Sequence, residues 1–162
     1  MTDKLKIYED ILAFHNAAEV PSRDTPGFPD DDRVALRRSL IEEEVGETLA
    51  ALEARDIVEV ADGIADSIVV LVGTALELGI DLTAVWHEVH RSNMTKFPEC
   101  RNCSGTGNEF DPFGELSCSG LVTCTSCDGR GTLIIRREDG KILKPNGWTP
   151  PNIPQALGIK ND

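Results

Sequence analysis

The sequence lacks several features that would place it in common functional classes. It contains no apolar run of about 18 residues, and its first ten residues hold no signal-peptide core, so we expect neither a membrane span nor secretion. Basic residues are not in excess: 28 acidic against 16 basic side chains give a charge of −12, which argues against coating of nucleic-acid backbones. No Ser, Cys or His forms a nucleophile arrangement. We therefore expect a cytoplasmic protein without membrane or nucleic-acid partners.

Cysteine is absent from the first 99 residues, and all five cysteines lie between residues 100 and 127. In a reducing compartment, such a cluster suggests metal ligands rather than disulfides. Four of them form the pairs Cys100-x2-Cys103 and Cys124-x2-Cys127, each continuing as CxxCxGxG. Two such turns close four thiolates around one Zn²⁺, and the glycines permit the tight turns. We predict a structural zinc site, with Cys118 as a free thiol outside both pairs.

Apolar residues recur at helical spacing in four segments. The segments cover residues 4–18, 33–54, 57–78 and 82–94. Asp56 and Asp81 are predicted N-caps, with Glu59 as the capping-box partner of Asp56, and Gly79 is the predicted stop of the third helix. A proline- and acid-rich connector follows the first helix. The fold class is all-α, and because one helix is apolar along much of its length we predict a homodimer or homotetramer.

The composition changes after Lys96. Residues 98–135 are rich in Gly, Cys and turn residues, and a segment with so few apolar side chains needs a metal to hold it together. A short hairpin is predicted around Asp139-Gly140, followed by an extended, proline-rich C-terminal tail. We predict a helical domain over residues 1–97 and 136–162, interrupted by a zinc-binding insertion over residues 98–135.

Two successive helices carry a dense set of carboxylates. Glu43, Glu44 and Glu47 share one helix face, where like charges cost an isolated helix about 0.2–0.5 kcal/mol per pair. Asp62 and Asp66 share a face of the next helix, and Asp66 opens an apolar run, where an aspartate is rarely unpaired. Hard oxygen ligands at this density suit Mg²⁺ or Mn²⁺. The alternatives are a solvated acidic surface, or salt bridges from the two aspartates to arginines.

The blocks LIEEEVGE, VADGIADSIVVLVGTALELGIDL, EVHRSNMTK and DGKILKPNGWTPPNI resemble the all-α NTP pyrophosphatase superfamily, which includes MazG-like proteins. Together they resemble its phosphoribosyl-ATP pyrophosphohydrolase-like branch, over residues 10–97 and 138–153. The cysteine segment, an insertion relative to that family, resembles the cysteine-rich region of DnaJ-type chaperones. The resemblance implies a four-helix MazG-like bundle that uses Mg²⁺ or Mn²⁺ to cleave a nucleoside triphosphate into a monophosphate and pyrophosphate.

The family motif is EExxE followed by ExxD on the next helix. Its first part corresponds to Glu43, Glu44 and Glu47. If Asp66 is the motif aspartate, the position three residues earlier is Gly63 instead of glutamate, and Asp62 is then the substitute. The literal ExxD from Glu59 to Asp62 is the other alignment. The acid that completes the metal site therefore stays open between Asp62 and Glu59.

The resemblance and the chemistry of the reaction together suggest roles for these residues. The predicted metal ligands are Glu44, Glu47, Asp62 and Asp66. Glu43 is the predicted general base that orients the attacking water. The resemblance further implies that the nucleotide is bound by Arg91, Asn93, Lys96, Lys141 and Lys144, whose cationic and polar groups suit phosphate oxygens. The alternative for Arg91 and Lys96 is that they only complement a helix C-terminus. Phe14, His15 and Trp148 are candidates for contacts with the base.

Three functions are compatible with these observations. The first is a pyrophosphohydrolase of (deoxy)nucleoside triphosphates, acting in nucleotide-pool housecleaning or precursor supply. The second is phosphoribosyl-ATP pyrophosphohydrolase, which the altered second motif and the zinc module make less favoured. The third is a non-enzymatic, zinc-containing binding or chaperone-like protein. We expect the first, because the carboxylates of both helices are then explained by one site.

Overall fold

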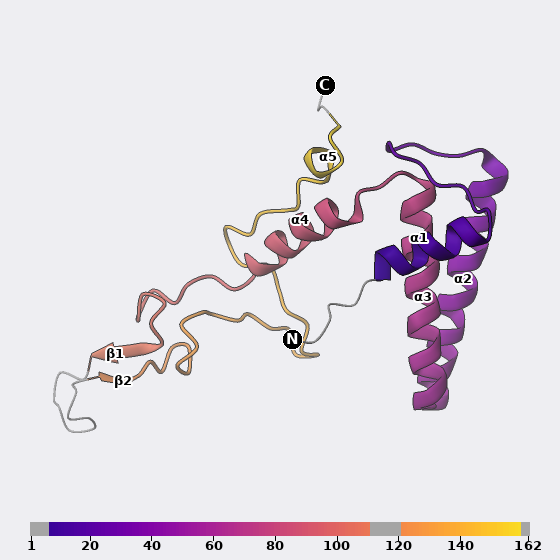
Figure 1. The fold of residues 1–162 in the computed structure, drawn as a ribbon. Helices are drawn as coiled ribbons and strands as arrows, with labels where there is room; N and C mark the ends of the chain where they lie inside the picture. The colour runs from indigo at the N-terminus through magenta and orange to yellow at the C-terminus, as the bar shows by residue number, and fades with distance from the viewer. Residues whose placement is uncertain (1–6, 111–120, 160–162) are drawn as a thin grey trace. The chain divides into compact units, whose positions relative to one another are not determined.

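The structure is a computed structural model that describes residues 7–110 and 121–159 (Figure 1). The predicted helical start at residues 4–6 and the predicted free thiol of Cys118 lie outside these residues. The chain divides into two compact units, residues 1–85 with 154–162 and residues 86–153. The predicted domain boundaries at residues 97 and 136 stay a prediction.

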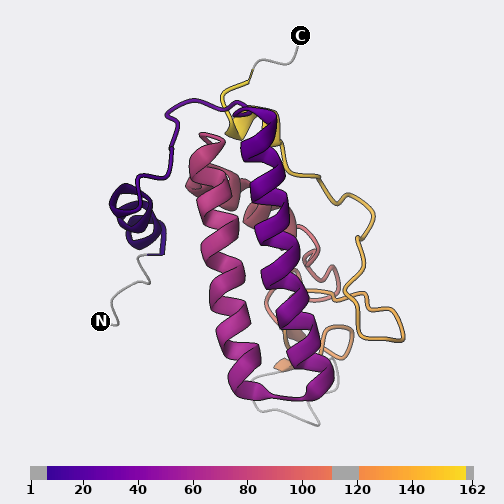
Figure 2. The same cartoon turned by 90° about the vertical axis from the view of Figure 1, so that its right-hand side faces the viewer.

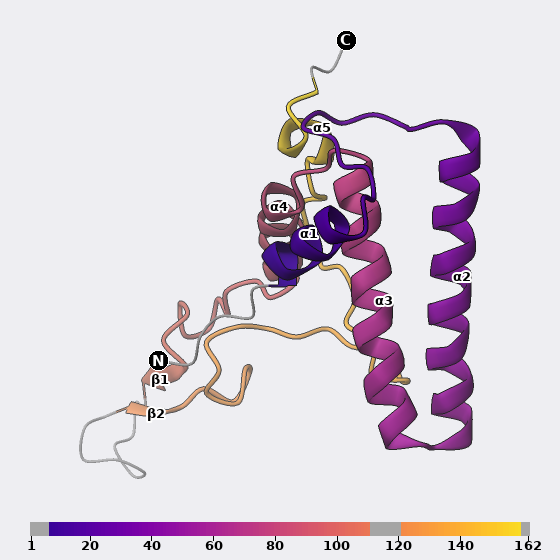
Figure 3. The same cartoon turned by 45° about the vertical axis from the view of Figure 1, so that its right-hand side comes forward.

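Three long helices make up most of the first unit: α1 (Ile7–Ala17), α2 (Asp31–Ala54) and α3 (Ile57–Glu77). α2 and α3 lie side by side as an antiparallel hairpin (Figure 2), and α1 packs against α3 (Figure 3). The best-buried apolar contact between α1 and α3 joins Ile11 to Val72 and Leu76. The apolar second half of α3 is therefore partly covered within the unit.

The turn between α2 and α3 consists of Arg55 and Asp56. Arg55 has a left-handed backbone (φ 58°), and its N–H donates to the carbonyls of Ala51 and Leu52, which ends α2. The Asp56 carboxylate accepts from the N–H groups of Val58 and Glu59, as an N-cap does. The N–H of Asp56 donates to the Ala51 carbonyl, so the reciprocal bond of the predicted capping box is not formed. The prediction of Glu59 as capping partner is therefore wrong, and its side chain does not have that role.

The predicted stop at Gly79 is confirmed. Gly79 has φ +65°, and a Cβ there would lie 2.1 Å from the carbonyl oxygen of Thr25, so only glycine fits the close approach. The same connector is held to the end of α3 by the N–H groups of Arg23 and Gly27, which donate to Leu76 and Leu78 (both 3.0 Å). The middle of the irregular segment between α1 and α2 is thus fastened to the end of α3.

The fourth predicted helix is α4 (Leu82–Met94), and its predicted N-cap is confirmed because Asp81 accepts from the Ala84 N–H (3.0 Å). α4 begins in the first unit and continues in the second. No single helix among the described residues is long and apolar enough to cross a membrane; α3 and α4 meet that test only when taken together as a bent pair. All four predicted helices are therefore present in a helix-rich fold.

The second unit holds the few short strands. β1 (Asn108–Phe110) and β2 (Leu121–Thr123) form an antiparallel pair that the sequence did not predict. The predicted hairpin at Asp139-Gly140 is a tight turn closed by one isolated bridge, Arg136 to Ile142. A four-residue helix, α5 (Ile153–Ala156), was also not predicted.

The predicted extended tail packs along α4 within the second unit. The indole N–H of Trp148 donates to the Ser92 carbonyl (3.1 Å), and the Ser92 hydroxyl donates to the Thr149 carbonyl (2.8 Å). Glu88 accepts from the Asn152 N–H (2.6 Å). These bonds fasten the tail at several points along one helix.

Candidate active site and metal centre

The four paired cysteines gather at one buried point. Their sulfur atoms all lie within 4.8 Å of one another; Cys100 to Cys124 measures 3.9 Å and Cys103 to Cys127 measures 3.7 Å. A Zn–S bond of about 2.3 Å in a tetrahedron puts sulfur atoms about 3.8 Å apart. The cluster therefore fits a tetrahedral zinc ion with four thiolate ligands, and the predicted CxxC…CxxC site is present.

Two equivalent turns, 24 residues apart, build this cluster. The Gly107 N–H donates to Cys103 Sγ and the Gly131 N–H to Cys127 Sγ, both at 3.3 Å. The turns also hold each other, because the Cys100 N–H donates to the Gly131 carbonyl (2.8 Å) and the Cys124 N–H to the Gly107 carbonyl (2.9 Å). A Cβ at Gly107 or Gly131 would lie 2.2 Å from a carbonyl of the opposite turn. The conformation of each turn therefore depends on the presence of the other turn.

Without a metal, the pKa values of Cys124 and Cys103 are shifted in opposite directions. Burial raises the pKa of Cys124 to about 12. Burial acts in the same direction on Cys103, but the Gly107 N–H and the neighbouring thiols lower its pKa to about 7. Four thiolates in one buried cluster require a compensating cation. The site is filled by four protein ligands when zinc is bound, which leaves no open position for catalysis and marks it as structural.

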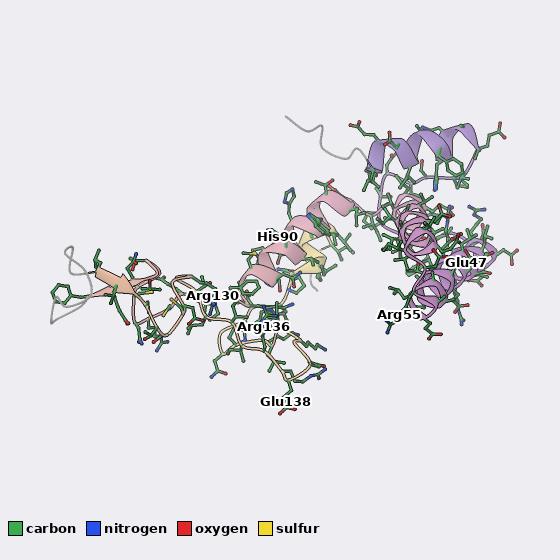
Figure 4. The ribbon with its side chains drawn as sticks, turned by 90° about the horizontal axis from the view of Figure 1, so that it is seen from below. Glu47, Arg55, His90, Arg130, Arg136 and Glu138 are labelled. Carbon is green, nitrogen blue, oxygen red and sulfur yellow. The ribbon has the colours of Figure 1, made fainter. Side chains whose placement is uncertain are left out.

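The predicted carboxylates lie on α2 and α3 of the first unit. Glu44 is half-buried, whereas its neighbours in the cluster are exposed: Glu43, Glu47, Asp62 and Asp66. Figure 4 labels Glu47 on α2, and Arg55 where that helix ends. The two helices touch beside this cluster, where the hydroxyls of Thr48 and Ser67 lie 3.2 Å apart. Both halves of the predicted motif therefore flank one helix–helix contact.

The electrostatics of Glu44 link the carboxylates of both helices. Partial burial raises the pKa of Glu44, and the negative charges of its neighbours raise it further, Asp66 most and then Glu47, Glu43 and Asp62. Glu59 is not among the charges that raise this pKa. The ionised form of Glu44 is thus repelled by carboxylates of both α2 and α3.

None of these carboxylates has a basic partner among the residues that the structure describes. The salt bridges found in residues 7–110 and 121–159 involve other acids, such as Glu42, Glu77 and Glu88. The alternative in which arginines neutralise Asp62 and Asp66 is therefore not found. The donor set suits Mg²⁺ or Mn²⁺, which prefer hard oxygen ligands. Within the described residues, only the cysteines bring three or more possible ligand atoms within 4.8 Å of one another. The carboxylates therefore lie near one another, but their oxygen atoms are farther apart than the sulfur atoms of the cysteine cluster.

Sequence analysis missed a buried ion cluster at the other end of the α2–α3 hairpin. Glu77 is 2% exposed and accepts hydrogen bonds from Arg33 (Nε, 3.1 Å) and from Arg37 of α2. Burial alone would raise the pKa of Glu77, but these two guanidinium groups lower it below its usual value. Gly73 leaves room for His15, whose Nε2 lies 3.5 Å from Arg37. A signal existed: Glu77 interrupts the apolar run TALELG, and Arg33 and Arg37 are one helical turn apart.

A cavity of ≈ 340 Å³ lies beside this ion cluster and is bounded by α1, α2 and α3. Its walls are largely apolar, with Phe14, Leu40 and Val69 among them, and His15 and Arg37 also line it. Leu40 is one helical turn before Glu44, and Val69 is one turn after Asp66. The cavity and the carboxylates therefore occupy adjacent positions along the same two helices.

The predicted substrate-binding residues all belong to the second unit: Arg91, Asn93, Lys96, Lys141 and Lys144. Arg91 binds Glu88 and also donates to Thr149 and to the Pro150 carbonyl, so its guanidinium group fastens the tail. Lys96 donates to Asn93 (2.8 Å). The Lys144 ammonium lies 3.7 Å from the ring centre of Trp148. Lys144 therefore covers one face of the ring that was predicted to stack on a base.

Comparison with known proteins identifies a family over the first unit and α4. None of the curated proteins matches the chain. The sequence profile of the family described as phosphoribosyl-ATP pyrophosphohydrolase matches residues 12–93, about half of the chain. The matched stretch contains α2, α3, the candidate carboxylates and nearly all of α4. At the level of the family, this supports a pyrophosphohydrolase-type activity on nucleotides. The chain therefore belongs to the phosphoribosyl-ATP pyrophosphohydrolase family.

Proposed function

We propose that this protein is a divalent-cation-dependent nucleoside triphosphate pyrophosphohydrolase. It would cleave a (deoxy)nucleoside triphosphate between the α- and β-phosphates, yielding a monophosphate and pyrophosphate. The observation that carries the proposal is the convergence of four carboxylate charges on Glu44, without a basic partner among the described residues. Because such repulsion costs stability, its retention is best explained by a bound cation that offsets it.

The positions of the carboxylates suggest which ones bind the metal and which one acts as general base. Glu44, Glu47, Asp62 and Asp66 would hold Mg²⁺ or Mn²⁺, and the ion would neutralise the triphosphate and lower the pKa of a bound water. Glu43 is exposed at the edge of the cluster, and it accepts the proton of the attacking water as general base. Asp62 is preferred over Glu59 because its charge, and not that of Glu59, acts on Glu44.

The base of the nucleotide would occupy the cavity of ≈ 340 Å³ between α1, α2 and α3. Its largely apolar walls suit a flat heterocycle, and a few polar groups such as His15 provide specificity, as in small-molecule sites generally. The cavity lies one helical turn from the carboxylates on each helix, so one extended ligand could contact both.

A nucleotide panel tests this proposal. Purified protein is incubated with each (deoxy)nucleoside triphosphate and with phosphoribosyl-ATP, with Mg²⁺ or Mn²⁺, and pyrophosphate is detected as phosphate after added pyrophosphatase. We expect turnover of at least one triphosphate that is abolished in Glu44→Gln and Asp66→Asn. Turnover of phosphoribosyl-ATP alone would favour the second function considered above. No turnover of any nucleotide would favour a zinc-containing binding protein instead.

We further propose that a second copy of the chain covers an apolar face of the hairpin. Val45, Leu49 and Leu52 on α2 are 37%, 56% and 54% exposed, and Ile64 and Leu71 on α3 are 48% and 50% exposed. Helical spacing places the three α2 residues opposite the acidic face. A homodimer through this face would leave the carboxylates accessible. Leu49→Asp should convert the wild-type oligomer to monomer in light scattering, and a monomeric wild-type protein would contradict the proposal.

A cytoplasmic location is proposed on the state of the cysteines. The thiols of Cys100, Cys103, Cys124 and Cys127 are free and gathered as metal ligands, which suits a reducing compartment.

A further inference from the structure

α2 and α3 approach each other closely beside the carboxylates, at Gly63 of α3 and Thr48 of α2. Gly63 of α3 is buried, and a Cβ there would lie 2.7 Å from Thr48 Oγ1 and 3.2 Å from Thr48 Cα and N. A side chain at position 63 would therefore require Thr48 and its backbone to move away from α3. The two helices are therefore in backbone-to-side-chain contact at this point.

The hydroxyl groups at the contact have defined directions. Thr48 Oγ1 donates its only proton to the Glu44 carbonyl (2.9 Å), so in the 3.2 Å contact with Ser67 it is Ser67 that donates. At this contact, a hydrogen bond from Ser67 of α3 to Thr48 of α2 joins the two helices. The Thr48 hydroxyl is in turn bonded to the backbone of Glu44. We name Thr48, Gly63 and Ser67 the spacer contact.

Each residue of the spacer contact is adjacent to a candidate ligand. Thr48 follows Glu47, Gly63 follows Asp62, and Ser67 follows Asp66. The α3 ligands are aspartates, whose carboxylates reach one methylene less far than those of the glutamates on α2. Packed helices commonly lie 8–10 Å apart, and a small residue at the contact permits the lower end of that range. Short aspartate side chains can share a cation with α2 only at such a close approach.

We propose that Thr48, Gly63 and Ser67 are positioning residues that set the helix separation at the divalent-cation site, an inference that rests on the proposed function. The contact also explains why the acid stands at position 62 and not at 63. A side chain at 63 would meet the Thr48 backbone, whereas Asp62 is exposed one residue earlier. The spacer contact thus fixes both how far apart the ligands are and which residue of α3 serves as one.

The test compares two Gly→Ala variants of the full chain, loaded with zinc. Gly63→Ala adds a methyl group at the spacer contact. Gly46→Ala is the matched control, because Gly46 lies in α2 next to Glu47 but has no atom within 4 Å of its Cβ position. Mn²⁺ affinity is measured without nucleotide, by calorimetry and electron paramagnetic resonance, and circular dichroism verifies helix content. We expect Gly63→Ala to weaken Mn²⁺ binding by about tenfold or more, the range found when support of metal ligands is lost, and Gly46→Ala to leave it unchanged.

A second pair keeps the test decisive if Gly63→Ala does not fold. Ser67→Ala removes the hydrogen bond between Ser67 and Thr48 without adding atoms, and it should weaken Mn²⁺ binding. Ser67→Thr keeps the hydroxyl and should retain most of the wild-type affinity for Mn²⁺. A folded Gly63→Ala or Ser67→Ala protein with wild-type Mn²⁺ affinity would overturn the proposal. Wild-type protein that binds Mn²⁺ but hydrolyses no nucleotide would refute the proposed function and leave the positioning role measurable. Wild-type protein that does not bind Mn²⁺ would refute both.

Discussion

The cysteine cluster and the carboxylate cluster of this molecule differ in how their candidate metal ligands are brought together. In the cysteine cluster, each pair of ligands comes from one short turn, and backbone hydrogen bonds hold both turns at sulfur–sulfur distances that suit zinc. In the carboxylate cluster, the ligands come from two long helices, and their distance depends on packing. The first arrangement is closed and structural. The second has exposed carboxylates, as a site that must admit a substrate requires.

The largest expected effect in this contrast comes from loss of the zinc. Cys127→Ser, or treatment with a strong chelator, should unfold the segment around residues 98–135, because structural zinc contributes about 10–16 kcal/mol in zinc-finger peptides. α1, α2 and α3 should keep their helical circular dichroism, since their contacts lie in the other unit. Zinc content and circular dichroism measure both effects.

Cys118→Ser is the control for this experiment, because Cys118 is outside both pairs. It should keep one zinc ion per chain. Loss of helix content in α1–α3 on zinc removal would show that the two regions are not independent.

The next largest effect is expected at the buried ion cluster that supports the hairpin. Glu77→Gln leaves Arg33 and Arg37 without their carboxylate and should reduce the free energy of unfolding by about 3 kcal/mol, as breaking buried ion pairs does. Because the pKa of Glu77 is lowered in the folded state, its contribution is present at neutral pH and is lost as the pH falls through that lowered pKa. Urea unfolding at pH 7 and at a pH below the usual glutamate pKa of about 4.3 measures the difference.

The matched control removes an exposed ion pair within α2. Glu42→Gln removes the partner of Arg38, whose side chain is 76% exposed, and should change stability by about 0.5 kcal/mol or less. Equal effects of Glu42→Gln and Glu77→Gln would contradict the role assigned to burial.

The two alignments of the second acidic motif predict different metal ligands. Asp62→Asn should weaken Mn²⁺ binding by about tenfold or more, whereas Glu59→Gln should leave it nearly unchanged. The reason is that, of these two residues, only Asp62 contributes a charge that raises the pKa of Glu44. Titration of each variant with Mn²⁺ distinguishes them. The reverse ranking would assign the literal ExxD alignment.

The smallest effect has an unusual sign. Without Mg²⁺ or Mn²⁺, Glu44→Gln should melt at a slightly higher temperature than wild type at pH 7, because it removes a charge that its neighbours repel. The pKa of Glu44 is raised in the folded state, so the wild-type carboxylate is protonated on acidification and the difference disappears as pH falls through that pKa. Added Mn²⁺ should raise the melting temperature of wild type only. A less stable Glu44→Gln protein at pH 7 would count against the repulsion.

Much of the fold follows from local sequence signals. The four helices were predicted from apolar periodicity, and Asp56, Asp81 and Gly79 mark their ends correctly. The cysteine cluster was predicted because each of its turns is encoded within eight residues. The carboxylates could be assigned to shared faces because residues three, four and seven apart lie together on any helix.

Other features depend on contacts between distant residues. Glu77 is bound by arginines 40 and 44 positions away, and no periodicity identifies that partnership. The role of Gly63 depends on Thr48 of another helix, so the sequence shows only a departure from the family motif. β1 and β2 contain three residues each, too few for an alternating pattern to stand out. The Glu59 capping partnership failed because the Ala51 carbonyl takes the Asp56 N–H.

The bond between Trp148 and Ser92 makes the attachment of the tail visible by fluorescence. The chain has only two tryptophans, and Trp86 is already 67% exposed, so a red shift in emission on detachment would come from Trp148. A Trp86→Phe protein would therefore carry a single tryptophan, Trp148, where the tail is bonded to α4. Its emission would follow tail release during nucleotide addition or proteolysis, without an attached dye.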